Sequence, residues 1–533
     1  MTSAELLIGV QKAFMGFDKR AERASDEILE ATFVDTGPLF DLVSSANNQV
    51  MYGRRGTGKT HVLKYLRRRL PNADEASVYL DLRQVGSNGS IYGDDNRPLS
   101  ERSYTLIVDV LQALQDELFI LAVEALETAP DAGQITTRVD ALSAAISEVK
   151  VVGEVETSVE EGSKGARSTG AELALSKEPS VGFKASIEAT ENSSARRTAR
   201  GSEKIHLNFG GIGTALSGLV AVLGIKRLWF LIDEWSEIPI DLQPYLADLL
   251  RRTVLPIGSI TIKIAAIDHR SNFIVHKAKG EYVGLELGAD ITADLNLDEF
   301  LVFDNNQEKS TEFFRSLLFR HYSSSDHYSP VLDTPDKLIQ AAFTQASAFD
   351  EFVRAVEGVP RDALNLATKV ATKAYGQQIS VPHVRSAARD WYQQDKHAVI
   401  RNNTPLDELL TKVISEVIGE RRARAFLFPN NERVPLIDQL FDARILHILK
   451  KNVSSHDEPG TRYDVYKIDY GCYVDMINTA KAPTALFSAI DDSSGDEELV
   501  EVPKDDYRSI RRAILKPEMI VSGSTGDEPK TAA

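Results

Sequence analysis

The chain has 533 residues, of which 43% are hydrophobic and 26% are charged, proportions typical of a globular protein of about two to four domains. Its formal net charge of −17 excludes a protein that coats nucleic acid over its whole surface, although screening beyond roughly 10 Å still permits a local basic face. A single cysteine, the lack of an apolar run of roughly 18 residues and the lack of a signal peptide exclude a disulfide scaffold, a cysteine-based zinc cluster and a membrane span, so we expect a soluble, cytoplasmic protein.

The first elements predict a helical segment followed by an α/β core. Residues 1–45 are expected to be helical, and Gly37-Pro38 interrupts them before a further short helix. Residues 46–128 are the first part of the core, with a strand at 48–52, a helix at 60–70, a strand at 76–82 and a long helix at 101–126. Strands separated by helices of this length indicate a parallel sheet with helical crossovers.

A glycine-rich loop lies between the first strand and the first core helix. Its sequence, Gly53-Arg54-Arg55-Gly56-Thr57-Gly58-Lys59-Thr60, fits the phosphate-loop pattern G-x-x-x-x-G-K-[ST] at every fixed position. Inward-turned backbone N–H groups hold phosphates, and glycine supplies the positive φ angles that this requires. Lys59 is expected to reach the β- and γ-phosphates of ATP, and Thr60 to offer its hydroxyl to Mg²⁺. We expect nucleotide contacts from Gly53, Gly56, Thr57, Gly58, Lys59, Thr60 and His61.

Residues 129–205 differ from the core in composition. They are rich in Ser, Thr, Gly, Ala and Glu and poor in aromatic residues, and residues 171–175 and 181–187 alternate as strands do. We interpret the segment as an insertion into the core. It is expected to be either a protruding β element or a mobile loop, with disorder as the alternative.

Residues 206–304 return to the α/β pattern. The apolar run from Arg227 ends in Asp233-Glu234, and acids at the carboxyl end of a central strand face the nucleotide crevice of such sheets. Asp233 is expected to hold Mg²⁺ through water. Glu234 is expected to orient and polarise the attacking water, since phosphoryl transfer depends mainly on positioning and charge stabilisation. Taken alone, an apolar run followed by two acids is an ordinary strand end.

Two further places in the core are candidates for catalytic cations. The helix at 242–252 ends in Arg251-Arg252, and either side chain could act as an arginine finger on a neighbouring subunit, although basic residues also favour any helix C-terminus. The strand at 260–267 ends in Asp268-His269-Arg270. His269 or Arg270 could contact the γ-phosphate or the water, with solvated loop residues as the alternative.

The remainder of the chain is expected to form a lid, a small domain and a tail. Residues 305–398 read as a helical lid, in which Gly358-Val359-Pro360-Arg361 opens a helix and Arg361 can face a phosphate; an exposed arginine is the alternative. Residues 399–490 are expected to be winged-helix-like, with a helix at 405–419, one or two helices at 435–450 and a strand at 463–468. The acidic tail, 491–533, is expected to be loosely ordered.

In this order, the motifs resemble the AAA+ and STAND class of P-loop ATPases, and in particular the origin-recognition initiator clade, across roughly residues 30–480 outside the insertion. The resemblance implies an α/β fold: a P-loop NTPase parallel sheet with helices on both faces, a helical lid and a C-terminal winged-helix-like domain. It also implies Mg-ATP bound at a subunit interface of a homo-oligomer, and hence a Mg-dependent ATPase that acts as a nucleotide-controlled switch or assembly factor. Two features depart from the family: the large insertion, and Asp268-His269-Arg270 in place of a clear sensor Asn or Thr.

The sequence leaves several alternatives for what such an ATPase acts on. Residues 401–480 contain 11 Lys/Arg and 12 Asp/Glu, a net charge of −1, whereas a DNA-reading domain is normally basic on its contact face. Basic clusters at Arg421-Arg422-Arg424, at Lys450-Lys451 and in the insertion leave DNA binding as one alternative. The others are a switch acting on a protein partner or effector, as in bacterial defence, and a nucleotide-binding scaffold without hydrolysis. Glu234 separates the scaffold from the rest, because a scaffold needs no water-activating carboxylate.

Overall fold

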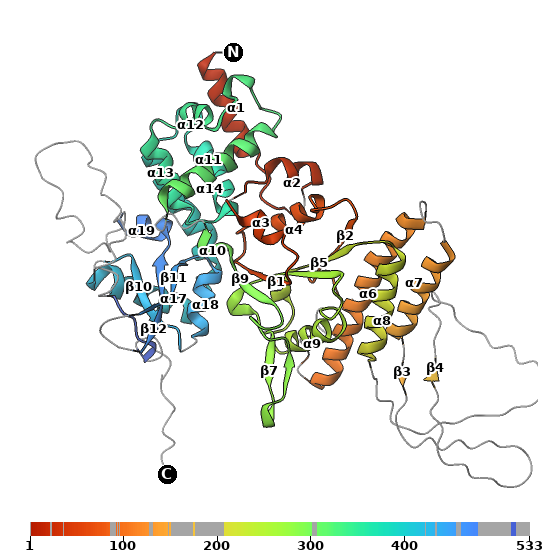
Figure 1. The fold of residues 1–533 in the computed structure, drawn as a ribbon. Helices are drawn as coiled ribbons and strands as arrows, with labels where there is room; N and C mark the ends of the chain where they lie inside the picture. The colour runs from red at the N-terminus through yellow and green to blue at the C-terminus, as the bar shows by residue number, and fades with distance from the viewer. Residues whose placement is uncertain are drawn as a thin grey trace, which may run out of the picture.

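The computed structural model describes residues 2–126, 132–147, 207–300, 306–454, 460–477 and 513–518, apart from the gaps 22–23, 36, 86–91, 93, 95, 422 and 432–433, together with two short strands within 149–175. No helix in these ranges is long and apolar enough to cross a membrane. Figure 1 shows the α/β core in the centre and at the right, the lid helices above it and the C-terminal unit at the left.

A parallel sheet forms the centre of the core, as the sequence predicts. Within the described residues it has five strands in the order β2–β5–β6–β1–β9, and all neighbours are parallel. Their bounds are β1 Gln49–Tyr52, β2 Glu75–Asp81, β5 Arg227–Asp233, β6 Ile260–Ala266 and β9 Thr292–Asn296. Parallel strands bring their carboxyl ends to one edge. At that edge Asp81 is paired in register with Asp233, beside the phosphate loop that follows β1.

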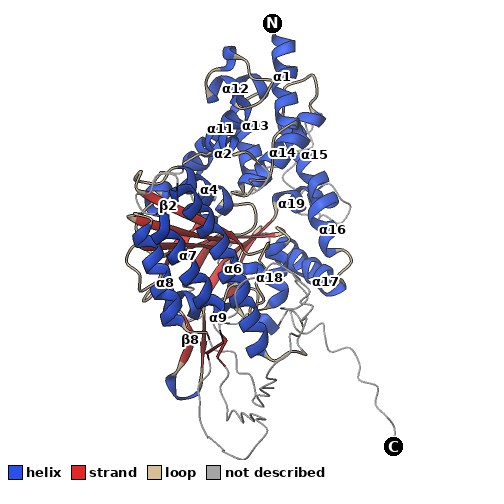
Figure 2. Cartoon of the chain, turned by 90° about the vertical axis from the view of Figure 1, so that its right-hand side faces the viewer, coloured by secondary structure: helices blue, strands red, loops and turns tan. Residues whose placement is uncertain are grey.

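Helices cover both faces of the sheet, which confirms the predicted α/β architecture (Figure 2). One face packs on α3 Leu39–Val43 and α4 Lys59–Arg68, and the other on α6 Leu99–Leu126, α8 Phe209–Val222 and α9 Gln243–Thr253. In β5, Trp229 and Leu231 belong to the first core, while Phe230 and Ile232 belong to the second. A strand buried on both faces reads as a continuous apolar run, which is why β5 was recognisable in the sequence. A hairpin of β7 Ile274–His276 and β8 Tyr282–Gly284 projects after β6 (Figure 1).

The segment expected to be an insertion begins with a helix, so the prediction of a β element or loop is wrong there. This helix, α7 Ala132–Ser147, lies beside α6 and α8, and its Leu142 and Ile146 join their core (Figure 1). Its few large apolar side chains are separated by Ser, Thr and Ala, which hid the helical period. A short antiparallel pair follows, β3 Val149–Lys150 with β4 Ala174–Leu175. The expected strand at 181–187 lies outside the described residues.

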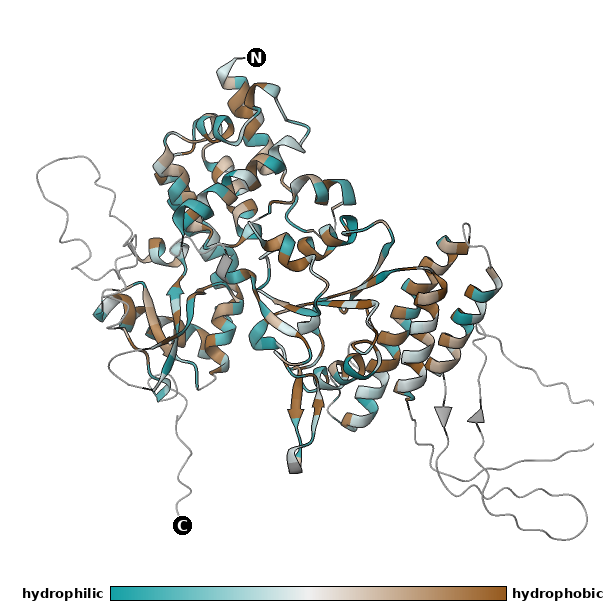
Figure 3. Ribbon diagram, in the orientation of Figure 1, coloured by the Kyte–Doolittle hydropathy of each residue, from teal (hydrophilic) through white to brown (hydrophobic). Residues whose placement is uncertain are grey.

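The lid is helical and includes the N-terminal helix α1 Ser3–Met15. Its other helices are α11 Gln307–Ser323, α12 Pro335–Ala342, α13 Ala346–Ala355, α14 Pro360–Lys373 and α15 Val381–Trp391. Val10 and Phe14 of α1 are fully buried in the lid core, and the Gln11 side chain donates to the carbonyls of Ala374 and Gln377 at 2.9 and 2.8 Å. These helices present hydrophobic and hydrophilic sides (Figure 3). A second N-terminal helix, α2 Asp26–Thr32, lies beside α4 instead.

The C-terminal unit combines short helices with an antiparallel sheet in the order β10–β12–β11. Its elements are α16 His397–Ile400, α17 Thr404–Val413, β10 Ala425–Pro429, α18 Pro435–Asp442, β11 Leu446–Ser454, β12 Arg462–Ile468 and α19 Tyr470–Ile477, with π-helical turns at Tyr392–Lys396 and Ile414–Glu420. The prediction of helix for 435–450 is correct only as far as Asp442. Beyond it the chain forms β11, because pairing with β12 buries Leu446 and Leu449.

Part of the tail is attached to this unit. Leu427 of β10 donates its N–H to the Ala513 carbonyl at 2.8 Å and accepts from Leu515 N–H at 3.0 Å. Ala513 and Leu515 are buried. The expectation of loose order is therefore wrong for residues 513–515, whose apolar side chains complete the edge of the small sheet. Residues 491–512 and 519–533 of the tail lie outside the described residues.

Candidate nucleotide site

The phosphate loop has the backbone conformation that its glycines predict. Gly56 and Gly58 have φ angles of 95° and 100°, in the left-handed region that favours glycine. Gly56 is also crowded, since a Cβ there would lie 3.0 Å from the Cβ of Arg361 and 3.1 Å from a methyl group of Val359. The backbone N–H of Arg361 donates to the Gly56 carbonyl at 3.2 Å. The loop therefore packs directly against the first turn of α14 in the lid.

Lys59 is held against its own loop. Its Nζ donates to the carbonyls of Gly53 and Arg54 at 2.6 and 3.1 Å, and the residue is 7% exposed. Burial lowers the pKa of Lys59, while Asp233 and Glu234 oppose that shift. The ammonium group therefore lies within the electrostatic influence of both acids at the end of β5.

The acid pair at the end of β5 is anchored by its neighbours. Asp233 is fully buried and accepts from the Tyr79 hydroxyl at 2.7 Å and from the Glu234 N–H at 2.8 Å. Glu234 has φ 56° and ψ 40°, a left-handed conformation that is strained for a glutamate. Burial and the adjacent Asp233 raise the pKa of Glu234, whereas Lys59 and Arg83 act against the shift.

A cleft of about 380 Å³ opens beside the loop. Of the predicted site residues, those that line it are Gly56, Gly58, Lys59, Thr60, His61, Glu234 and Arg361. Gly53 and Thr57 support the loop from behind; the Thr57 hydroxyl donates to the Arg54 carbonyl at 2.9 Å. The cleft is rich in cations, as a polyphosphate would require.

Sequence reasoning missed several basic residues of this cleft. Lys19 and Arg20 come from the segment between α1 and α2, Arg55 from a variable position of the loop, and Arg83 from the turn after β2. Arg83 lies 3.5 Å from Glu234 and also pairs with Asp81. Of these residues, Arg83 alone had a signal in the sequence. It lies two residues beyond the end of β2, and β2 is the neighbour of β5, the strand that ends directly before Glu234.

A small apolar cavity of about 50 Å³ adjoins the cleft and shares Gly58, His61, Leu317 and Pro360 with it. Phe33, Leu39 and Phe313 contribute apolar walls. His61 donates from Nε2 to the Leu29 carbonyl at 2.7 Å, and burial lowers its pKa. A neutral, anchored His61 fits the wall of such a cavity better than a phosphate contact.

None of the other four predicted residues lines the cleft, and one of them is Asp233, the fully buried carboxylate described above. Arg251 donates to Asp248 at 2.8 Å and to the Tyr282 hydroxyl at 2.9 Å, and Arg252 donates to the same carboxylate at 2.7 Å. His269 donates to Asp442 of α18 at 2.9 Å and stacks edge-on against Phe441. Its contacts connect the core with the C-terminal unit.

The side-chain oxygen atoms available to a metal ion are only part of what Mg²⁺ needs. Thr60 and Asp233 offer oxygen atoms, which Mg²⁺ prefers, and both oxygens of Asp233 already accept one hydrogen bond each. Within the described ranges, no cluster of three or more His, Cys, Asp or Glu side chains could hold a metal ion. A magnesium ion at this place would therefore need oxygen atoms of a bound phosphate to complete its coordination.

The phosphate loop and the parallel sheet that carries it define the P-loop NTPase fold. Residues 17–80 match the family model described as ORC-CDC6-like, which confirms the resemblance to origin-recognition-type ATPases. Solved structures similar to the chain include the Walker-type ATPase PABY2304 of Pyrococcus abyssi, with TM-score 0.39, 10% identity, and coverage of 87% of this chain and 99% of that one. Another is the Aeropyrum pernix Orc1 protein in complex with DNA, with TM-score 0.30, 14% identity, and coverage of 83% and 91%. No curated protein matches.

Proposed function

We propose that the protein is a Mg-dependent ATPase whose nucleotide state controls a conformational or assembly switch. One observation carries the proposal: the phosphate loop, Glu234 and the lid residue Arg361 line a single cleft. A cleft that joins a phosphate-binding loop to a carboxylate of raised pKa supports hydrolysis, and a cleft completed by the lid supports a change of lid position with nucleotide.

Each part of the cleft has a role in this proposal. The loop N–H groups and Lys59 bind the phosphates, and Arg361 adds a cation from the lid. The apolar cavity beside the loop, walled by Phe33, Leu39 and Pro360, offers a place for the base, because such walls bury a flat ring without unpaired polar groups. Thr60 and Asp233 would hold Mg²⁺, which neutralises developing phosphate charge when bound.

Glu234 is the residue that would make the site hydrolytic. Glu234 follows the end of a central strand and lines the cleft. Its carboxylate lies 3.5 Å from the Arg83 guanidinium, which restrains it. A carboxylate with a raised pKa orients water and accepts a proton more readily than an ordinary one. Arg251 and Arg252, away from this cleft, stay candidates for contact with a neighbouring subunit in a homo-oligomer.

The test compares two variants with exposed controls. Lys59→Ala is expected to abolish ATP binding, whereas Glu234→Gln is expected to bind ATP and lose turnover by at least about 100-fold. Lys226→Ala and Glu312→Gln change exposed side chains of the same types and should behave as wild type. Equal turnover in wild type and Glu234→Gln would leave the protein a nucleotide-binding scaffold.

A DNA-acting role is the second candidate, favoured by the ORC-CDC6-like match and by the helix, strand, helix and hairpin order of the C-terminal unit, the order that a winged-helix-like domain would need. Against it, Arg424 is buried in an ion pair with Glu357 and Lys451 pairs with Asp268, so one residue of each of two basic clusters is engaged internally. DNA affinity measured against salt decides: a phosphate-contacting surface must lose affinity as salt rises.

A further inference from the structure

Arg54 belongs to the phosphate loop, but its side chain extends away from the cleft to other parts of the chain. Only 4% of the residue is exposed. Its Nε lies 3.0 Å from Asp298 of the short helix α10 Leu297–Phe300, which follows β9, and its Nη2 donates to the Glu357 carbonyl of the lid at 2.9 Å. Its Nη1 contacts Nδ1 of His447 in β11 of the C-terminal unit, and its guanidinium lies over the Phe441 ring. One loop residue therefore contacts the core, the lid and the C-terminal unit.

Glu357 is joined to both sides of this junction. Its carbonyl accepts from Arg54, while its carboxylate pairs with Arg424 and, at 3.2 Å, with Lys467, both buried residues of the C-terminal unit. Glu357 has a positive φ of 51°, an uncommon conformation for a glutamate. The turn that it begins leads directly to Arg361, whose N–H is bonded to Gly56.

His447 continues the connection into the C-terminal unit. Since the guanidinium can only donate, Nδ1 of His447 accepts and Nε2 carries the proton that it donates to Asp469 at 3.1 Å. Asp469 also pairs with Lys396 and accepts the backbone N–H groups of Gly471 and Cys472 at the start of α19. Burial and Arg54 lower the pKa of His447 to about 4, which keeps the ring neutral beside the guanidinium.

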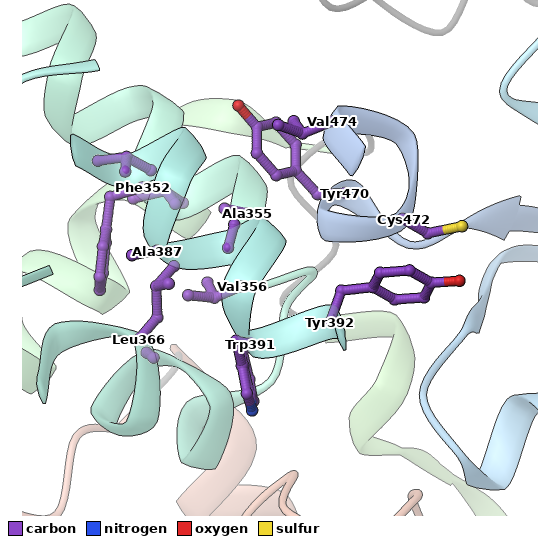
Figure 4. Close-up of a cluster of buried hydrophobic side chains, with 14 of the residues drawn as sticks. Phe352, Ala355, Val356, Leu366, Ala387, Trp391, Tyr392, Tyr470, Cys472 and Val474 are labelled. Atoms are coloured by element: carbon purple, nitrogen blue, oxygen red, sulfur yellow. The ribbon is translucent and has the colours of Figure 1, made fainter. Parts of the chain in front are cut away.

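The apolar contacts that surround this network also join the two units. Figure 4 shows Tyr470, Cys472 and Val474 of α19 beside Val356 and Trp391 of the lid and Tyr392 of the π-helical turn that follows. These residues share one hydrophobic core.

If the C-terminal unit separated from the lid, Arg54 would lose the His447 acceptor and the Phe441 ring but keep Asp298 and the Glu357 carbonyl. The Glu357 carboxylate would lose Arg424 and Lys467, and removing the partners of a buried charge is strongly destabilising. The Glu357 turn, which holds Arg54 through its carbonyl, would then have to rearrange.

We propose that Arg54 is a positioning residue that makes the nucleotide-binding conformation of the phosphate loop depend on docking of the C-terminal unit. The proposal rests on the proposed function, since it concerns the same nucleotide site. The backbone of Arg54 links its buried side chain to the phosphate loop. Its carbonyl accepts hydrogen bonds from Lys59 and Thr57, and its N–H donates to Asp298 at 2.9 Å. By reciprocity, nucleotide binding must tighten docking by the factor by which docking tightens nucleotide binding.

The test uses variants outside the cleft. His447→Leu removes the acceptor for Arg54, and Arg54→Lys keeps the charge but loses the forked geometry. Arg462→Ala, an exposed arginine of β12, is the control in the same unit. ATP affinity is measured by calorimetry, and hydrogen exchange of residues 446–477 is measured with and without ATP. Melting curves are used to check that each variant is folded. If one of the two variants does not fold, the other still provides the test.

We expect His447→Leu to weaken ATP binding about tenfold, within the 5- to 150-fold range typical of coupled sites, and Arg462→Ala to bind as wild type. The Arg54→Lys/His447→Leu double variant should be little weaker than either single variant, because both remove one interaction. ATP should slow exchange in residues 446–477 of wild type and not of Arg54→Lys. Unaltered affinity in the folded single variants, or fully additive losses, would overturn this inference alone. If the wild type binds no ATP, the proposed function fails with it.

Discussion

The hydroxyl of Tyr79 in β2 donates to the carboxylate of Asp233 in β5, with 2.7 Å between the two oxygens. The two residues come from neighbouring strands of the sheet, and Asp233 is fully buried. Burial, together with the Asp233 charge, raises the pKa of Tyr79 well above its usual range, so the phenol stays a donor. A proposed magnesium-holding carboxylate is thus kept in place by a residue that no ATPase motif includes.

Tyr79→Phe should therefore destabilise the fold. The substitution keeps the ring but removes a donor to a buried carboxylate, and hydrogen bonds to charged groups contribute about 1.5–3 kcal/mol. Urea unfolding should show a loss of that size in the free energy of unfolding. Tyr328→Phe, at a residue that is 41% exposed, should change it by less than about 0.5 kcal/mol. Equal stability of wild type and Tyr79→Phe would mean that water replaces the hydroxyl without loss.

Glu234 combines a proposed catalytic role with a strained backbone, and two substitutions separate these properties. Glu234→Gly and Glu234→Ala both remove the carboxylate, so neither should turn over ATP. At φ 56° a residue with a side chain is less stable than glycine by about 1 kcal/mol. The free energy of unfolding of the glycine variant should therefore be about 1 kcal/mol higher than that of the alanine variant. Equal stabilities of the two variants would show that the observed φ stores no strain.

The sequence was sufficient for the elements whose signal is local. The strands β1, β2, β5 and β6 are short apolar runs between breakers, and the phosphate loop has a fixed spelling. The elements that were missed depend on distant partners. β9 is an edge strand, and its pairing with β1 joins residues 243 positions apart in the sequence, Gln49 and Thr292. Likewise β11 has apolar residues that suit a helix until β12 pairs with it.

The same distinction applies to the site. Lys59, Thr60 and Glu234, which line the cleft, could be proposed from the sequence because the motif or the strand end fixes their positions. Arg54 occupies a position of the motif that any residue can fill, and its role depends on His447, which lies 393 positions later. His269 was expected at the nucleotide because it follows a strand end, yet Asp442 of α18 engages it. The positions of Arg54 and His269 are determined by contacts between units that are distant in the sequence. A single sequence contains no pattern that predicts such contacts.

Lys263 is a buried lysine at the centre of the sheet that the proposed mechanism does not use. It is 2% exposed in β6, its Nζ donates to the Gln49 side chain at 3.1 Å, and it lies over the Trp229 ring. Burial lowers the pKa of Lys263 to about 7, although the Asp294 charge opposes the shift. The folded protein therefore binds the Lys263 proton less tightly than the unfolded chain does.

This difference predicts how stability changes with pH. Above about pH 7 the folded state releases the proton of Lys263, whereas the unfolded state keeps it until about pH 10.5, so the contribution of Lys263 to the free energy of unfolding rises with pH between these values. Below pH 7 both states are protonated and the contribution is constant. Lys263→Met lacks this titration. From pH 6.5 to pH 9, urea unfolding should show wild type gaining about 1–3 kcal/mol relative to Lys263→Met, since one pKa unit corresponds to about 1.4 kcal/mol. A pH-independent difference would mean that the ammonium group of Lys263 stays charged in the folded sheet, with Gln49 and Asp294 sufficient to hold it.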